Sequence, residues 1–283
     1  PVTRVFLAPY HKTRAFSLWK GTLRSIIGAK KEDTAETVKK LAKDNLSNEM
    51  KEFSHLLNPV LGLEQEEADA TKNLSPKDRK DLTFALTENL LNSCGERVIL
   101  ADNIENSDPT SLEFLNFLFQ GGKWKNIKFA ATSRGIDENL SRIFNLFEVL
   151  ELKPFSEEGE LKYLENNIKL KQISSSTIKF FRSKSSGNPK YINAIIDMLK
   201  NEGVIKKEGE NFYVDEDRLF KTQIPESLEE IYLKKVDSLL KEEREIVQYA
   251  SVLGYSVSLF LLSHTTSKDR EYLLKILNDL VGK

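Results

Sequence analysis

The chain has 283 residues, of which 40% are hydrophobic and 30% are charged, and its formal net charge is −1. This length allows one large domain or two to three small ones, and the near-neutral charge excludes a general attraction to nucleic acid or to an acidic membrane surface. The single cysteine, Cys94, excludes an internal disulfide and a multi-cysteine metal site and fits a reducing compartment. No apolar run approaches about 20 residues, so we predict a cytoplasmic protein without a membrane span.

The first half of the chain predicts strands that alternate with helices. In chain order, the apolar pattern predicts a strand over 4–8, a helix over 17–27, one or two exposed helices over 30–55, a helix over 76–93, a strand over 97–102, a helix over 109–121, a strand over 127–134 and a further short apolar run of the same series over 147–155. Ser75 and Asp108 are the predicted N-caps of the helices that begin at Pro76 and Pro109. This alternation predicts a mostly parallel sheet that helices cover on both faces.

From residue 156 onward, helical patterns dominate. They predict helices over 157–168, 174–186 and 190–202, a hairpin within 203–216 that turns at Gly209, and helices over 227–239, 241–252, 257–265 and 268–281. We therefore predict three parts: an α/β core over 1–155, a helical subdomain with a small hairpin over 156–224, and a winged-helix-like helical region over 225–283.

Polar residues end two of the predicted strands. In parallel sheets, ligands bind beyond the carboxyl ends of the strands, and Asp102 and Arg134 both occupy that edge. A carboxylate in this position can hold a hydrated Mg²⁺, and an arginine can sense a phosphate through charge-assisted hydrogen bonds. The alternatives are that Asp102 only makes a turn and that Arg134 only makes a surface salt bridge.

A phosphate-binding loop would need the pattern G-x-x-x-x-G-K-[ST], and no stretch fits it. The closest lysine, Lys123 after Gly122, has Phe117 in place of the first glycine and Trp124 in place of the serine or threonine. The three histidines are scattered without the spacing of metal ligands, and Gly187-Asn188-Pro189 alone indicates a helix end followed by a helix start.

The segment "RVILADNIENSDPTSLEFL", residues 97–115, resembles the strand and helix "LVLVLDDLHWADPASLELL" of STAND-class P-loop NTPases. These relatives of AAA+ proteins occur beside nucleotide cyclases, kinases, transcription activators and TPR arrays. "ATSRG" resembles the polar sensor at the end of the family's next strand, and "SSGNPKYINAIIDMLKNEGVIKKEG" resembles the stretch with the family's Gly-x-Pro motif. The last part, from "IYLKKVDSLL" on, resembles the family's winged-helix region.

The resemblance implies a nucleotide-binding α/β core with ATP and Mg²⁺ as cofactors. Asp102 would be the magnesium ligand, Thr132 and Arg134 the sensor, and Gly187 and Pro189 the residues on the adenine side. Asn103 replaces the family's second acidic residue and an amide is no general base, which leaves Glu105 as the neighbouring carboxylate that could substitute.

The resemblance further implies a phosphate-binding loop upstream of Pro1, in a longer protein of which this chain would be the distal part. That protein would be an ATP-dependent switch with slow or absent hydrolysis. It would regulate effector domains on the same polypeptide and could form homo-oligomers, whereas this chain alone would bind nucleotide weakly at most. One alternative is a non-catalytic protein-interaction scaffold. A second alternative is a DNA-binding, initiator-like AAA+ protein, which the mixed charges of residues 237–283 disfavour.

Overall fold

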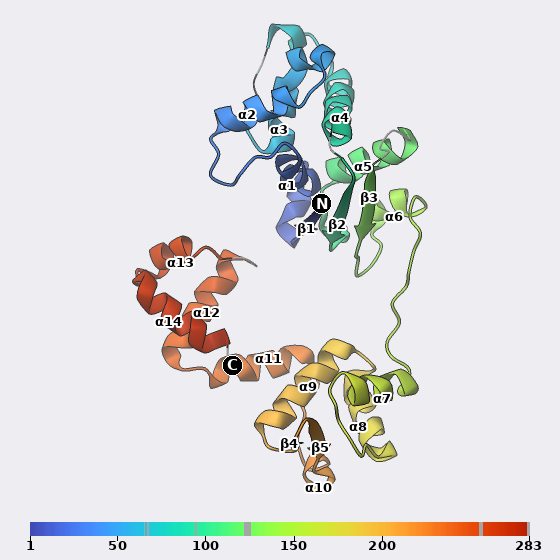
Figure 1. Cartoon of the computed structure of the whole chain (residues 1–283), viewed down its shortest axis with the longest axis vertical. Helices are drawn as coiled ribbons and strands as arrows, with labels where there is room; N and C mark the ends of the chain where they lie inside the picture. The colour runs from blue at the N-terminus through green and yellow to red at the C-terminus, as the bar shows by residue number, and fades with distance from the viewer. Residues whose placement is uncertain (65, 67, 94, 122–125, 255–256, 282–283) are drawn as a thin grey trace. The chain divides into compact units, whose positions relative to one another are not determined.

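The computed structural model describes residues 1–64, 66, 68–93, 95–121, 126–254 and 257–281 (Figure 1). The chain divides into two compact units, Pro1–Leu150 and Glu151–Lys283, and each is described by itself. Cys94, Gly122, Lys123 and Trp124, which the sequence analysis singled out, lie outside the described residues. Among the described helices, none combines the length and the apolar content that crossing a bilayer requires.

A three-stranded parallel sheet forms the centre of the first unit. Its strands are β1 (Val2–Phe6), β2 (Arg97–Asp102) and β3 (Ile127–Ala131), in the order β1-β2-β3. Val5, Ala101 and Ala131 lie side by side in the register. Parallel neighbours need long crossover connections, and both connections here contain helices. The α/β class is therefore confirmed in this form.

Six α-helices and four 3-10 helices accompany the sheet within the described part of this unit. They are α1 (Ser17–Ile26), α2 (Ala35–Asp44), α3 (Asn58–Leu61), α4 (Pro76–Ser93), α5 (Pro109–Gly121), α6 (Glu138–Phe144), η1 (Pro9–Thr13), η2 (Asn48–Leu57), η3 (Asp69–Thr71) and η4 (Ile104–Asn106). The predicted helix starts at Ser17, Pro76 and Pro109 are confirmed.

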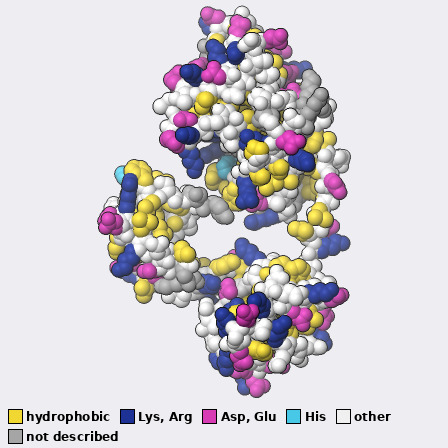
Figure 2. All heavy atoms as spheres, viewed as in Figure 1, with side chains coloured by type: hydrophobic (Ala, Val, Ile, Leu, Met, Phe, Trp, Pro, Cys, Tyr) yellow, Lys and Arg dark blue, Asp and Glu magenta, His cyan; other side chains and the backbone are white. Residues whose placement is uncertain are grey.

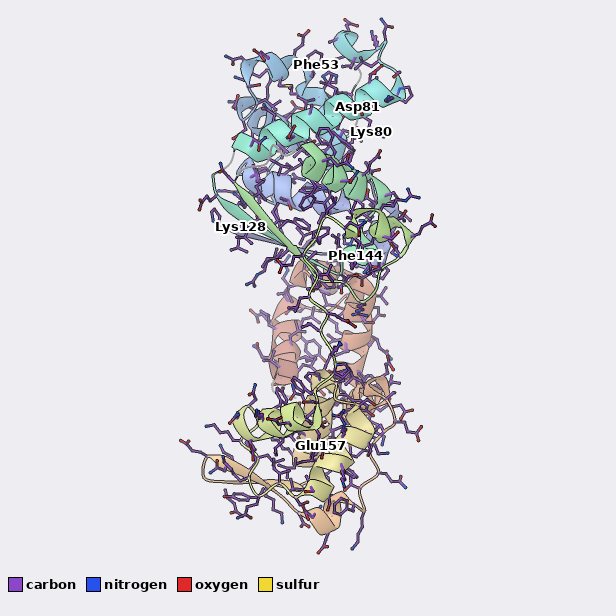
Figure 3. All side chains as sticks on the ribbon, turned by 90° about the vertical axis from the view of Figure 1, so that its right-hand side faces the viewer. Phe53, Lys80, Asp81, Lys128, Phe144 and Glu157 are labelled. Carbon is purple, nitrogen blue, oxygen red and sulfur yellow. The ribbon has the colours of Figure 1, made fainter. Side chains whose placement is uncertain are left out.

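Trp19 of α1 is the largest fully buried side chain of this core. Its indole N–H donates to the Ser111 carbonyl of α5 at 3.0 Å, and its ring meets Phe114 edge-on at 5.0 Å between centroids. The salt bridge of Lys80 on α4 to Glu113 on α5, at 2.5 Å, joins these two helices at the surface, and Figure 3 labels Lys80. Helices α1, α4 and α5 thus share one core.

That core covers one face of the sheet. On the covered face, Thr3 and Ile99 are buried, and Phe129 beside them packs against Trp19. On the other face, Val2 is 59% exposed and Phe6 is 39% exposed, and Lys128 and Ala130 are also exposed. Figure 3 labels Lys128 on β3. The prediction of helices on both faces is therefore wrong for the described residues, because α1, α4 and α5 all contribute to the same apolar layer.

The apolar run 147–155 forms no strand; Figure 1 shows it as an irregular connection after α6. Leu150 is 83% exposed and Leu152 is 87% exposed. An extended segment is stable as a strand only when a neighbouring strand satisfies its backbone groups, and this run pairs with no strand among the described residues. Including it in the strand series was therefore wrong.

The second unit is mainly helical, as its sequence pattern predicts. Its elements are α7 (Glu157–Asn166), α8 (Ser175–Ser185), α9 (Pro189–Asn201), β4 (Ile205–Glu208), β5 (Asn211–Val214), α10 (Glu216–Leu219), α11 (Leu228–Ser238), α12 (Lys241–Leu253), α13 (Leu259–Thr266) and α14 (Arg270–Val281). Strands β4 and β5 are antiparallel and confirm the predicted hairpin, with Gly209 at φ +63° in the turn. One hydrophobic cluster surrounds Ile192 and Ile195 of α9, and a second one surrounds Ile246 of α12.

Candidate functional site

The carboxyl edge of the sheet brings two of the predicted site residues into contact. Asp102 ends β2 and Thr132 directly follows β3. The Thr132 hydroxyl donates a hydrogen bond to Oδ1 of Asp102 and accepts one from the Asn103 N–H at 3.1 Å. The Thr132 N–H in turn donates to the Ala101 carbonyl at 2.9 Å, which continues the pairing of β2 with β3 beyond the strands. The sheet register therefore sets the position of both side chains.

Asp102 is exposed to solvent while one of its oxygens is held by Thr132. Magnesium sites of this kind use one or two carboxylates, several waters and the phosphates of a nucleotide. The described residues contain no group of three or more histidine, cysteine or acidic side chains that could hold a metal by itself. The edge therefore fits Mg²⁺ as part of a metal–phosphate complex, and it does not form a closed metal site of its own.

Arg134 lies two residues beyond Thr132 and is exposed, and within the described residues it makes no ion pair. Glu105 lies on the helical turn η4, which follows Asp102 after one residue. Its side chain is half-buried, and its Oε2 atom is buried without a hydrogen-bond partner. Asp102 at the end of β2 and three polar residues that follow β2 or β3, Glu105, Thr132 and Arg134, thus lie at the carboxyl edge of the sheet.

Asn103 has a left-handed backbone, with φ 58° and ψ 54°. Glycine tolerates this conformation because it has no Cβ atom, and asparagine tolerates it better than most residues because its short polar side chain can form local hydrogen bonds. The turn from β2 into η4 therefore supplies a backbone reason for an asparagine at this position. The sequence indicates this role only through the abrupt end of an apolar run at Asp102-Asn103.

Asp108 confirms the predicted helix cap and has a second role that the sequence did not indicate. It accepts hydrogen bonds from the Ser111 N–H and hydroxyl of α5, at 2.9 and 2.6 Å. It also accepts from the Phe16 N–H at 3.1 Å, and from the Ser17 N–H and hydroxyl at 2.9 and 2.8 Å. One buried carboxylate therefore joins the N-termini of α1 and α5.

Gly187 and Pro189 belong to the second unit, where local geometry accounts for both. Gly187 has φ +76°, and a Cβ atom there would lie 2.6 Å from the Phe155 carbonyl oxygen. Pro189 is the first residue of α9, which Asn188 caps through the N–H groups of Lys190 and Tyr191. The glycine is required for the close approach of residues 154–155, and a nucleotide contact at these two residues stays a prediction.

Comparison of the chain with models of known protein families, with curated proteins and with solved structures gave no match.

Proposed function

We propose that this chain is the distal part of an ATP-dependent signal-transduction switch of the STAND class. The observation that supports this proposal most is the hydrogen bond between Thr132 and Asp102 at the carboxyl edge of a parallel sheet. A strand-end carboxylate that is hydrogen-bonded to a hydroxyl just beyond the next strand is the arrangement expected where a magnesium ligand and a polar sensor share one phosphate site.

The open surfaces of the sheet also support the proposal. One face lacks a helical layer among the described residues, and β3 pairs with β2 alone. The exposed Leu150 and Leu152 follow in an apolar run without a strand partner. An additional strand beside β3, followed by a helix on the open face, would bury these groups, and a phosphate-binding loop would connect that strand to that helix.

In this arrangement each residue of the edge has a defined task. Asp102 holds a hydrated Mg²⁺, Thr132 fixes the orientation of the Asp102 carboxylate, and Arg134 contacts the terminal phosphate. Asn103 cannot accept a proton from water, which makes hydrolysis slow and suits a switch that regulates effector domains of the same polypeptide. Self-assembly of such switches into homo-oligomers is part of the same proposal.

Calorimetric titration of ATP·Mg²⁺ into this chain, and into a form extended at its N-terminus by the preceding residues of its gene, tests the proposal. We expect binding by the extended form and at most weak binding by the shorter one. Asp102→Asn in the extended form should weaken binding at least about tenfold, because a charged metal ligand is lost. Asp81→Asn, which removes an exposed carboxylate of α4, is the matched control and should change nothing.

A second candidate is a protein-interaction module without nucleotide chemistry. Large apolar side chains on the last helices favour it, since Val252, Phe260 and Val281 are all more than half exposed. If neither form of the chain binds ATP, and Val252→Lys with Phe260→Lys abolishes a self-association measured by light scattering, this second candidate replaces the first.

A further inference from the structure

A basic cavity lies beside the outer strand of the first unit. Its volume is about 460 Å³, and its wall consists of residues from β1, η1, α1 and the end of α3. Five of these residues carry or can carry a positive charge: Arg4, His11, Arg14, Lys20 and Arg24. In Figure 2, Lys and Arg side chains gather near a histidine at one margin of this unit.

Among the described residues, no aspartate or glutamate lines the cavity, although the whole chain has one acidic residue more than its basic ones. Within the described residues, none of the four Arg and Lys side chains makes an ion pair. Arg14 lies over the Tyr10 ring at 5.1 Å, and Arg24 donates to the Leu61 carbonyl at 3.5 Å. The charges therefore converge on the cavity without a counter-ion from the part of the chain that the structure describes.

Several features fix the positions of these groups. Lys20 and Arg24 are one turn apart on α1, so both project from the same face of the helix. The Lys20 ammonium nitrogen lies only 2.2 Å from the position that a Cβ atom of Gly62 would occupy. A side chain at residue 62 would therefore displace it. His11 accepts a hydrogen bond from the Ala8 N–H on Nδ1 at 2.8 Å, which leaves Nε2 as the donor of the neutral ring.

We propose that this basic cavity binds a compact, multiply phosphorylated anion, such as a polyphosphate or a small molecule with adjacent phosphates. Guanidinium groups form two parallel hydrogen bonds with a phosphate, and three of them surround this cavity together with one ammonium. The volume lies in the range of small-molecule sites, and the charges gather in a hollow instead of along a stripe that a nucleic-acid backbone would follow.

This site is separate from the proposed nucleotide site, since Asp102, Thr132 and Arg134 do not line the cavity. Binding there needs no metal ion. A calorimetric titration of sodium tripolyphosphate into the chain, in magnesium-free buffer, tests the proposal. Circular dichroism of every variant checks that the fold is kept.

The wild-type chain should bind one tripolyphosphate, and the double variant Arg4→Gln, Arg14→Gln should bind at least about tenfold more weakly. Both replaced side chains are exposed, so the fold should tolerate the change. Arg142→Gln is the matched control, because it removes an exposed arginine of the same unit outside the cavity. This control should bind as the wild type does.

Three results would overturn the inference: no binding by the wild-type chain, an equal loss in Arg142→Gln, or citrate binding as tightly as tripolyphosphate. If a short single-stranded oligonucleotide bound more tightly than tripolyphosphate, the proposal of a compact ligand would be wrong, and the cavity would instead bind a nucleic-acid backbone. The cavity shares no residue with the proposed nucleotide site, so failure here leaves that site unaffected.

Discussion

At the scale of single residues, Asp108 shows how a buried charge can organise the region around a candidate site. Its side chain is only 2% exposed, and it accepts hydrogen bonds from Phe16, Ser17 and Ser111. A buried carboxylate is tolerated only when donors satisfy it, and here the donors belong to two helix N-termini. The Asp-Pro pair predicts the cap of α5, but the bond to α1 joins residues far apart in the chain and has no local pattern.

Replacing Asp108 by asparagine should lower the free energy of unfolding of the first unit by about 2–4 kcal/mol, because the amide nitrogen cannot accept from the two serine hydroxyls. Asp137→Asn is the control, since Asp137 caps one helix, α6, and asparagine is an equally good cap. Its other contact, an ion pair with Lys12, lies at the exposed surface and contributes little. Denaturant titration measures both variants. Equal effects of the two substitutions would show that Asp108 acts as a simple cap.

At the scale of elements, the long helices were predictable, whereas the short helices α3, α6 and α10 and the conformation of one apolar run were not. Helices α4, α5 and α9 begin at Pro76, Pro109 and Pro189, and each start combines a capping residue with a proline in the first turn. Such signals are local, so sequence alone reveals them. A strand needs a partner edge, and the apolar run 147–155 contains nothing that tells whether that edge is present.

We expect the double substitution Leu150→Ser, Leu152→Ser to change the free energy of unfolding of this chain by less than about 0.5 kcal/mol, because both side chains are already in water. Leu115→Ala is the comparison. Leu115 is fully buried in α5, and its truncation should cost about 2–5 kcal/mol through lost contacts and a cavity. A loss above about 1 kcal/mol in the double variant would mean that the run is packed in solution.

At the scale of the whole molecule, each hydrophobic cluster lies within one unit. The first cluster contains residues from Leu7 to Ile143, whereas the other two begin after Leu150. The sequence predicted the parallel sheet from the alternation of strands and helices. It could not predict which face the helices cover. The face on which a connecting helix lies depends on the order of the strands in the sheet, and the apolar pattern of an amphipathic helix does not reveal that order.

The two compact units predict two unfolding transitions in calorimetry, one for each unit. Single substitutions should assign each transition to its unit. Leu115→Ala should lower the midpoint of one transition, and Leu199→Ala, in the fully buried face of α9, should lower that of the other. If each substitution shifted both midpoints equally, the two units would unfold as one cooperative body.

Glu160 makes the unfolding transition of the second unit depend on pH in a defined direction. The side chain is fully buried in α7, one of its oxygens lacks a hydrogen-bond partner, and burial raises the pKa of its carboxyl above the ordinary value. The Arg182 guanidinium, 3.6 Å away, offsets only part of this effect. A raised pKa in the folded state means that Glu160 stabilises the fold at acidic pH, and that this contribution is lost as pH rises through the folded pKa.

Glu160→Gln removes that titration, so the midpoint of the second unit's transition in the variant, relative to the wild type, should rise as the pH increases from the ordinary carboxyl pKa through the raised pKa of the folded state. The first transition should keep the same midpoint in both proteins at every pH. A difference between variant and wild type that did not change with pH would mean that Glu160 keeps an ordinary pKa, and that the Arg182 guanidinium fully compensates for its burial.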